Sequence, residues 1–322
     1  MYLFLAFLAL LTERIVGYPD WVYRAVGHPV TWIGRLISLL DGRWNREGDG
    51  FGHRRQWGIA ALVSILMLVI TIALLVQNLL LALPLGFIPL IVVSATLPAQ
   101  KSLERHVEAV ATALETSGLE AGRTAVSMIV GRDPDQLDEP AVCRAAIESL
   151  AENFSDGIVA PAFWLGVGGL AGGAAYKAVN TADSMIGHRS PRHEAFGWAA
   201  ARFDDLVNLP ASRLTGALFV IAAGFVEGAS LRHAIDAIRR DAGHHRSPNA
   251  GWPEAAMAGA LGIALAGPRS YGGETIEARF MGDGGRSNLG ATDIRRALKL
   301  ARVADGLLIG LFGLAALVIS QV

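Results

Sequence analysis

The longest uncharged stretch of the chain runs from Gln56 to Gln100, where 45 residues pass without an Asp, Glu, Lys, Arg or His. A membrane-spanning helix needs about 20 apolar residues, so this stretch is long enough for two. The pattern predicts a membrane hairpin with arms at Trp57–Val76 and Leu79–Leu97. Pro84, Gly86 and Pro89 interrupt the second arm and should kink it.

Five shorter apolar stretches predict different elements. Met1–Leu11 is interpreted as a short first membrane helix that stays in the protein, and Gly306–Ile319 as the last clear span. Gly157–Tyr176 is uncharged and long enough to span, but it carries six glycines. The apolar stretches within Arg213–Glu227 and Ala255–Pro268 are too short for an ordinary span. We expect these last three to be re-entrant or buried elements, although Gly157–Tyr176 could also cross once.

Apolar residues at helical spacing mark the amphipathic segments. Val30–Leu40 is typical of a helix that lies at the membrane interface. Residues 99–156 have the pattern of a soluble-like helical insertion, with one helix at Leu103–Ser117 and a second from Glu139 to about Asn153. The expected fold is therefore an all-α, polytopic membrane protein, in which residues 1–322 form a single membrane-embedded catalytic domain with a cytoplasm-facing polar site.

Composition and charge agree with a membrane protein. Hydrophobic residues make up 52% of the chain and charged residues only 18%, against about 25% charged in soluble domains. The net charge of −1 gives no basic excess that would indicate a nucleic-acid partner. The single cysteine, Cys143, excludes an internal disulfide and a cysteine-based metal site.

The basic residues around the predicted hairpin indicate its orientation. Gly17–Trp57 precedes the hairpin and is rich in arginine, and Lys101–Arg105 follows it. Both ends of a hairpin face the same side, and Lys and Arg accumulate in cytoplasmic segments. We therefore expect a multi-pass protein of the inner membrane whose polar site opens to the cytoplasm.

Three clusters of oxygen-bearing side chains interrupt the apolar chain. Glu148, Glu152 and Asp156 follow an i, i+4, i+8 spacing that puts them in one stripe on a helix, with Asn153 beside it. The other two clusters consist of Asn180 with Asp183, and of Asp204, Asp205 and Asn208. Mg²⁺ held together with substrate phosphates would suit this combination. Each cluster alone is also compatible with a solvated helix end.

Basic side chains alternate with these acids. Some must form structural salt bridges, and others would bind phosphate oxygens, but the sequence does not separate the two groups. His188 and His193 are candidate acid–base groups, for which a structural role is the default. His28 and Arg35 flank a predicted helix start and are candidates for binding, and Arg246 lies in a polar loop. The basic residues that alternate with the acids are Lys177, Arg189, Arg192 and Arg202.

Several nucleotide and hydrolase motifs are absent from the sequence. There is no Gly-x-x-x-x-Gly-Lys-Ser/Thr loop and no Gly-x-Gly-x-x-Gly motif after a strand. There is also no Gly-x-Ser-x-Gly elbow and no His-Glu-x-x-His helix. A nucleotide, if the protein uses one, is therefore not held by a P-loop or a Rossmann site.

Five segments, in this order along the chain, together resemble the CobD/CbiB family, the adenosylcobinamide-phosphate synthases of cobalamin biosynthesis. They are His28–Arg35, Glu148–Pro161, Tyr176–His188, Ala201–Arg213 and Ser247–Pro253. The resemblance implies an integral membrane enzyme that joins adenosylcobyric acid to (R)-1-aminopropan-2-ol O-phosphate through an amide bond, using ATP and Mg²⁺. The expected partners are these two substrates, the lipid bilayer, other late cobalamin-pathway membrane enzymes and a second copy of the chain.

The resemblance gives each candidate residue a hypothetical role. Glu148 or His188 would accept the amine proton, and Lys177 would act in catalysis on the transferring phosphate. The metal ligands would be Glu152, Asp156, Asp183, Asp204 and Asp205. The substrate- and nucleotide-binding residues would be His28, Arg35, Asn153, Asn180, Arg189, Arg202, Asn208 and Arg246.

Two other classes of protein share parts of this pattern. A membrane prenyltransferase-like enzyme also binds Mg²⁺ and diphosphate through Asp-rich motifs, but it would need a helical barrel of full spans. A transporter of a charged solute would have acids and bases near the membrane midplane and pseudo-symmetric halves. The clear spans here lie at the two ends of the chain with the polar motifs between them, which argues against a transporter.

Overall fold

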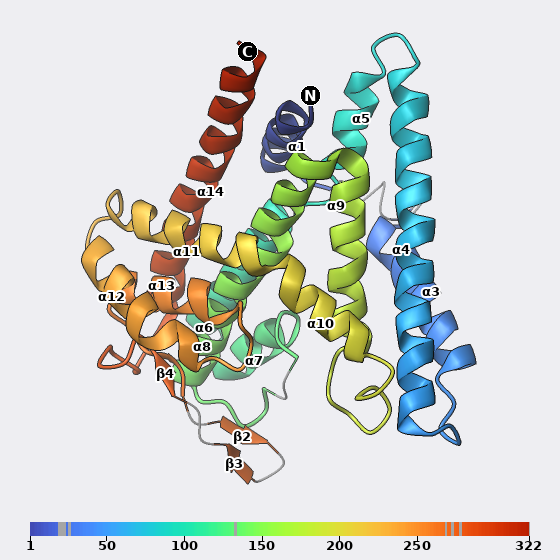
Figure 1. The fold of residues 1–322 in the computed structure, drawn as a ribbon. Coiled ribbons are helices and arrows are strands. Elements are labelled where there is room, and N and C mark those ends of the chain that lie inside the picture. Colours follow the sequence, from blue (N-terminus) through green and yellow to red (C-terminus); the bar gives the residue numbers. More distant parts are fainter. Residues whose placement is uncertain are drawn as a thin grey trace. The chain divides into compact units, whose positions relative to one another are not determined.

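In the computed structural model, the chain is described over residues 1–18, 24, 27–131, 134–267, 269–271, 274–276 and 279–321. These residues are predominantly helical (Figure 1). They form two compact units. The first comprises Met1–Ala99, Ala160–Asn208 and Phe312–Val322, and the second comprises Gln100–Val159 and Leu209–Leu311.

The core of the first unit lies where α3, α4, α9 and α10 pack around buried side chains that include Ile37, Ile65 and Phe196. A β carbon on Gly58 of α4 would lie 1.8 Å from the carbonyl oxygen of Phe196, so only glycine permits this approach. The helices of this unit are α1 (Tyr2–Val16), α3 (Pro29–Trp44), α4 (Phe51–Leu81), α5 (Phe87–Ser94), α9 (Ala160–Ile186) and α10 (Trp198–Val207).

The structure has a helix of spanning length at the first predicted arm of the hairpin but not at the second. α4 has 31 residues, and apolar side chains such as Met67 and Leu75 are mostly exposed on it. The second arm is broken by a turn, after which α5 has only eight residues. Eight helical residues extend about 12 Å, far short of the roughly 30 Å of a bilayer core. The uncharged stretch therefore holds one helix of spanning length.

The glycine-rich segment folds back on itself. At Gly169 the backbone of α9 leaves the helical conformation, with φ 62° and ψ −155°. Figure 1 shows α9 rising in one arm and returning in a second. A β carbon on Gly172 would lie 2.3 Å from the carbonyl oxygen of Trp164, although residues eight apart in a straight helix are separated by about 12 Å. Of the alternatives predicted for Gly157–Tyr176, a single straight crossing is therefore wrong, and the segment is a broken helix.

Gln77 of α4 stabilises the break in α9. Its side-chain Oε1 accepts a hydrogen bond of 2.9 Å from the buried backbone N–H of Leu170, which would otherwise lack a helical partner. Gly169 cannot easily be replaced, because a β carbon there would lie 2.5 Å from that same oxygen and 2.8 Å from the ring of Tyr2. The fold-back thus depends on a polar side chain within an apolar helix.

The second unit is a compact group of shorter helices. The apolar stripe predicted for α6 is confirmed, since Val107, Val110 and Leu114 are buried. Asp138 caps α8, accepting a hydrogen bond of 2.8 Å from the N–H of Ala141. The elements are α6 (Gln100–Ser117), α7 (Leu119–Ser127), α8 (Glu139–Phe154), the π-helical turn η1 (Ser155–Val159), α11 (Leu209–Ala223), α12 (Leu231–Asp241), the 3₁₀ turn η2 (Ala242–His244), α13 (Gly251–Leu261) and most of α14 (Ala291–Ser320).

Four short strands in this unit correct the all-α expectation. β1 (Leu265–Ala266) pairs antiparallel with β4 (Phe280–Met281), and β2 (Arg269–Tyr271) pairs antiparallel with β3 (Glu274–Ile276). Strands of two or three residues are too short to produce a period-two pattern in the sequence. The fold is therefore nearly, but not entirely, α-helical.

Within the described part of the chain, three helical segments have the length and apolar character to cross a membrane: α4, the continuous run Glu139–Ile186, and α14. α10 and α11 together could form a fourth, broken span. The 15 residues of α1 confirm a helix at the N-terminal apolar run, but a short one. The fold-back at Gly169 falls within the second of these segments, which therefore does not cross as one straight helix.

Candidate functional site

A polar seam lies between the returning arm of α9 and α10 in the first unit. We define it as Tyr176, Asn180 and Asp183 of α9 with Asp204 of α10 and Asn208, which ends that helix. The Tyr176 hydroxyl donates a hydrogen bond of 2.8 Å to Asn208 Oδ1, and Asn208 Nδ2 donates one of 2.9 Å to Asp204 Oδ2. Helical spacing on both helices brings these five side chains together.

Asp204 is the least satisfied group of the polar seam. Its side chain is only 8% exposed, and its partners are the neutral amides of Asn208 and Asn180. The buried Oδ1 atom has no hydrogen-bond partner in the described part of the chain. Asp183 and Asp205 lie close enough for their charges to act on it. A buried carboxylate surrounded by amides and other acids lacks a positive counter-charge, which a ligand can supply.

Basic groups lie at the edge of the polar seam. Arg202 pairs with Asp205 at 3.3 Å, and both side chains are substantially exposed. His188 is exposed and lies within electrostatic reach of Asp183. Arg189 is exposed beside it, and Lys177 is half-buried on α9. The second and third predicted acid clusters and these four basic residues thus all belong to the first unit.

His28 serves as the N-cap of α3. Its ring Nδ1 accepts a hydrogen bond of 3.2 Å from the N–H of Val30, which leaves the ring proton on Nε2. Burial and the nearby charge of Lys177 lower the pKa of His28 below its usual value, which favours the neutral ring. Arg35 is exposed and makes no contact with the charged groups of the polar seam among the described residues.

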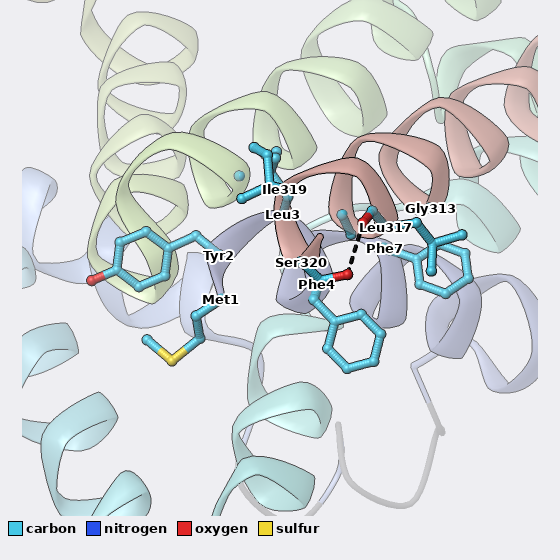
Figure 2. A pocket seen from close by; sticks show the side chains of 11 residues that line it. Met1, Tyr2, Leu3, Phe4, Phe7, Gly313, Leu317, Ile319 and Ser320 are labelled. Carbon is cyan, nitrogen blue, oxygen red and sulfur yellow. Dashed lines mark hydrogen bonds between the residues drawn. The ribbon is translucent and has the colours of Figure 1, made fainter. Parts of the chain in front are cut away.

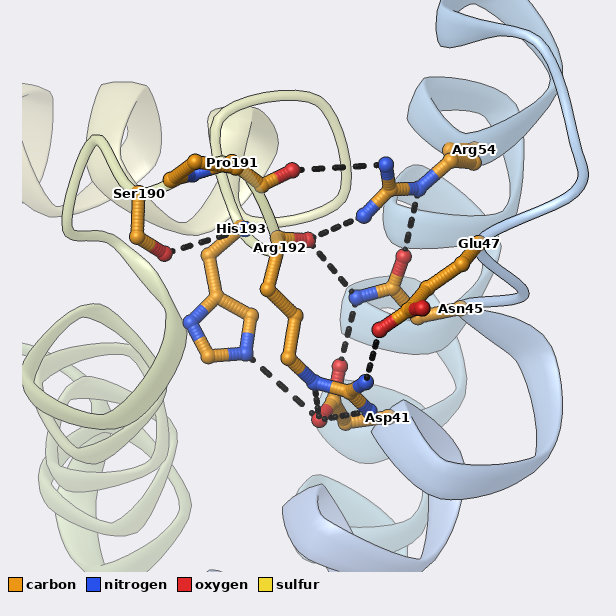
Figure 3. Close-up of polar contacts among 8 residues, drawn as sticks. All are labelled: Asp41, Asn45, Glu47, Arg54, Ser190, Pro191, Arg192 and His193. Atoms are coloured by element: carbon orange, nitrogen blue, oxygen red, sulfur yellow. Dashed lines mark hydrogen bonds and ion pairs between the residues drawn. The ribbon is translucent and has the colours of Figure 1, made fainter.

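The loop between α9 and α10, which carries His188 and Arg189, is fixed by a network from α3 and α4 (Figure 3). Asp41 accepts hydrogen bonds from Asn45 Nδ2 at 2.7 Å and from Arg192 Nη2 at 2.8 Å. Burial alone would raise the pKa of Asp41, but the hydrogen bonds from Asn45 and Arg192 outweigh it and lower the pKa.

Arg54 completes this network from the start of α4. Its Nε donates to Asn45 Oδ1 at 2.8 Å, and its Nη2 donates to the carbonyl oxygen of Arg192. His193 approaches Asp41 at 3.5 Å. Arg192 and His193 therefore have the structural roles that the sequence left open. Asp41 and Asn45 had no sequence signal beyond their i, i+4 spacing.

The first predicted acid cluster belongs to the second unit. Glu148 is buried and accepts a hydrogen bond of 2.8 Å from the N–H of Ala266, whose φ is 58°. Glu152 is exposed, and Asp156 is half-buried in η1. Asn153 donates hydrogen bonds of 2.9 and 3.1 Å to the carbonyl oxygen and the hydroxyl of Ser149. The three acids of the predicted stripe therefore have different environments.

Arg246, the remaining candidate, is exposed in the loop before α13. Among the described residues, no group of three or more His, Cys, Asp or Glu side chains is arranged to hold a metal ion. Mg²⁺ does not need such a cage, because it keeps several waters and usually binds one or two carboxylates plus substrate phosphates. The unpartnered oxygen of Asp204, near Asp183, fits that mode of binding.

An apolar cavity of about 700 Å³ lies elsewhere in the first unit (Figure 2). Its lining contains no Asp, Glu, Lys, Arg or His, so it does not offer charges for phosphate chemistry. The cavity is lined by Met1, Tyr2, Leu3, Phe4 and Phe7 of the N-terminal segment, Gly166 of α9, and Gly313, Ala316, Leu317, Ile319 and Ser320 of α14.

The chain is similar to known proteins over most of its length. The sequence model of a family described as CobD/Cbib protein matches residues 6–301. A protein of Sinorhizobium fredii named "Cobalamin biosynthesis protein CobD" is 53% identical over 90% of this chain and 89% of its own length. Proteins of the same name from Rhizobium meliloti and Rhodobacter capsulatus are 49% and 48% identical, each covering 96% of this chain and 95% of their own length. No solved structure is significantly similar to the chain.

Proposed function

Because the chain belongs to the CobD/CbiB family of cobalamin biosynthesis, we propose that it catalyses ATP-dependent amide-bond formation between adenosylcobyric acid and (R)-1-aminopropan-2-ol O-phosphate. The product is adenosylcobinamide phosphate. Family membership favours this reaction over the prenyltransferase-like and transporter alternatives. The observation that carries the proposal beyond family membership is the buried carboxylate of Asp204, whose Oδ1 has no partner in the described part of the chain.

The reaction requires activation of a carboxylate. A carboxylate is a poor acyl donor, but transfer of the γ-phosphoryl group of ATP to it gives an acyl phosphate and ADP. The amine then attacks the acyl carbon, loses a proton, and expels phosphate as the amide forms. Both ATP and the amino-alcohol phosphate bring negative charge, so the site must supply cations and hydrogen-bond donors.

The polar seam suits the phosphate-bearing part of this reaction. Asp204 and Asp183 would hold Mg²⁺ together with substrate phosphates, and the ion would neutralise developing charge on the transferred group. Asp205, which pairs with Arg202, remains a proposed ligand. Glu152 and Asp156 lie in the second unit, outside the polar seam, and stay predicted metal ligands. The bases proposed to bind phosphate oxygens are Lys177, Arg189 and Arg202.

The remaining proposed roles concern protons and positioning. His188 is exposed near Asp183 and is the better candidate to accept the amine proton, because Glu148 is buried and accepts a backbone hydrogen bond. Asn180 and Asn208 would orient Asp204 through the hydrogen bonds of the polar seam. His28, Arg35, Asn153 and Arg246 remain proposed binding residues.

We also propose that the protein is a multi-pass inner-membrane enzyme whose site opens to the cytoplasm. The fold-back of α9 supports this orientation, because its two arms can enter and leave on one side. After Cys143→Ser, cysteines introduced at Ser190 and Ser247 should be shielded from a membrane-impermeant maleimide in intact cells and should react in inverted vesicles. Labelling of Ser190→Cys from outside would contradict a cytoplasmic site.

The direct test is reconstitution. Protein purified in detergent is incubated with adenosylcobyric acid, (R)-1-aminopropan-2-ol O-phosphate and Mg-ATP, and the products are identified by mass spectrometry. The proposal predicts adenosylcobinamide phosphate and an equal amount of ADP, with no product when either ATP or Mg²⁺ is omitted. Product formation without ATP consumption, or none under any condition with folded protein, would refute it.

A further inference from the structure

Arg213, in the first turns of α11, is fixed by neutral groups of the second unit. Its Nη1 donates hydrogen bonds to Ser212 Oγ at 2.9 Å, to Asn249 Oδ1 at 2.8 Å and to the carbonyl oxygen of Leu209 at 3.3 Å. The guanidinium carbon lies 4.9 Å from the ring centroid of Trp252. One edge of the guanidinium is therefore held in place, and an aromatic ring covers part of it.

The buried Ser212–Asn249 contact makes this setting rigid. Ser212 Oγ donates to Asn249 Oδ1 at 3.0 Å, so the same oxygen accepts from both the hydroxyl and Arg213. Ser212 and Asn249 are 0% and 6% exposed. Ser212 and Asn249 are neutral, so these contacts do not compensate the positive charge of the half-buried Arg213 guanidinium.

Other arginines of the second unit are arranged differently. Arg240 donates from two nitrogens to Asp241, and Arg286 donates from two nitrogens to Asp293. Arg295 likewise donates from two nitrogens to Glu115. Arg213 makes no ion pair with a described carboxylate, and its Nε and Nη2 donate to no described acceptor. In Arg240 and Arg295 the two donating nitrogens are Nε and Nη2, the edge that has no described acceptor in Arg213. In Arg286 they are Nη1 and Nη2.

We propose that Arg213 forms a binding site for a phosphoryl group, which its Nε and Nη2 contact in bidentate fashion. The planar guanidinium matches two oxygens of a phosphate, and the fixed geometry reduces the entropy lost on binding. This inference deepens the proposed function and rests on it for the identity of the ligand. The phosphoryl group belongs either to ATP or to the amino-alcohol phosphate, which carry the same chemistry.

Three variants separate a phosphate-binding role from a structural one. Arg213→Gln removes the charge and the two-nitrogen edge but keeps a polar side chain. Arg213→Lys keeps the charge but loses the planar edge. Arg144→Gln is the matched control, because Arg144 is a half-buried arginine of the same unit whose Nη1 donates to the carbonyl oxygen of Ser287 at 2.7 Å.

Binding is measured by calorimetry on detergent-solubilised protein with inorganic phosphate, Mg-ATP, (R)-1-aminopropan-2-ol O-phosphate and the unphosphorylated amino alcohol. Arg213→Gln should weaken binding of inorganic phosphate and of one phosphorylated substrate at least tenfold, and leave the unphosphorylated compound unaffected. The substrate that loses affinity identifies the source of the phosphoryl group. In turnover, its KM should rise by a similar factor while kcat changes less than threefold.

Arg213→Lys should lose affinity severalfold, and Arg144→Gln should behave as the unaltered protein. Unchanged binding of all phosphate compounds by the folded Arg213 variants would overturn the proposal, as would an equal loss in Arg144→Gln. If Arg213→Gln does not fold, Arg213→Lys tests the proposal by the same criteria. The protein could bind phosphate through Arg213 and still show no ligase activity. That result would refute the proposed reaction but support the phosphate site at Arg213.

Discussion

Two regions of the molecule bury carboxylates in opposite ways. In the second unit, Asp241 is 1% exposed and accepts hydrogen bonds from Arg240 and from the backbone N–H groups of Gly282 and Asp283. In the first unit, Asp204 is 8% exposed and is bonded only to neutral amides. A carboxylate with a cation and oriented N–H groups stabilises the fold, whereas one without them is free to bind a ligand. The comparison therefore separates a structural acid from an acid that we propose binds a ligand.

Substitution at Asp204 should have the largest effect on activity. Asp204→Asn keeps the shape and the amide contacts but removes the proposed metal ligand, so we expect turnover to fall by about 100-fold or more. Thermal stability should stay the same or rise, because an uncompensated buried charge is removed. Asp205→Asn should also abolish turnover. Near-normal activity of both variants at limiting Mg²⁺ would show that the metal assignment is wrong.

The fold-back of α9 should be sensitive at Gly169. Gly169→Ala places a β carbon against Gln77 and Tyr2 at positive φ, and we expect it to destabilise the protein by about 2–4 kcal/mol in denaturant unfolding. Gly168→Ala is the control, because a β carbon there meets nothing within 4 Å. Equal stability of the two variants would mean that the break at Gly169 is not required.

Substitution at Asp241 should reverse the pattern seen at Asp204. Asp241→Asn removes charge-assisted hydrogen bonds to Arg240, Gly282 and Asp283, and should cost about 1.5–3 kcal/mol of stability. The kcat of the molecules that remain folded should be unchanged, since this acid has no proposed role in the reaction. A variant that is stable but inactive would break the distinction between the two regions.

The contribution of Asp241 to stability should also depend on pH, and this effect should be smaller than those of the substitutions. Burial would raise the pKa of Asp241, but hydrogen bonds from Arg240, Gly282 and Asp283 outweigh it and lower the pKa. Its stabilising contribution is therefore complete above the unfolded pKa, near 4, and is lost as the pH falls through the lower folded pKa. The difference in unfolding free energy between the unaltered protein and Asp241→Asn should be constant from pH 7 to 5 and shrink below about pH 4. A difference that grows on acidification would contradict this account.

The sequence predicted the features that depend on local periodicity. The stripe of Val107, Val110 and Leu114 follows from helical spacing and is confirmed. The predicted start of a helix at Glu139 is confirmed as well. The second membrane arm was mispredicted because apolar length alone does not distinguish a span from a helix broken by a turn. The turn requires Gly86, where a β carbon would lie 1.6 Å from the carbonyl oxygen of Leu80.

The sequence predicted which residue types form the candidate site and the contacts within one helix, but not the pairs between residues far apart in the chain. Asp204 and Asn208 share one helical face, so their contact could be expected. The sequence could not separate structural from ligand-binding arginines, because Arg192 pairs with Asp41, 151 residues earlier in the chain. The sequence also could not distinguish Arg213 from the arginines that form ion pairs. Long-range packing decides whether a carboxylate lies beside an arginine.

Binding of Mn²⁺ tests most directly whether Asp204 is a metal ligand. Mn²⁺ accepts the same oxygen ligands as Mg²⁺, and its free form is measured by electron paramagnetic resonance. The unaltered protein should bind the ion in the presence of ATP, Asp204→Asn should bind it at least tenfold more weakly, and Asp241→Asn should bind it as well as the unaltered protein. Equal affinity of the unaltered protein and Asp204→Asn would contradict the account.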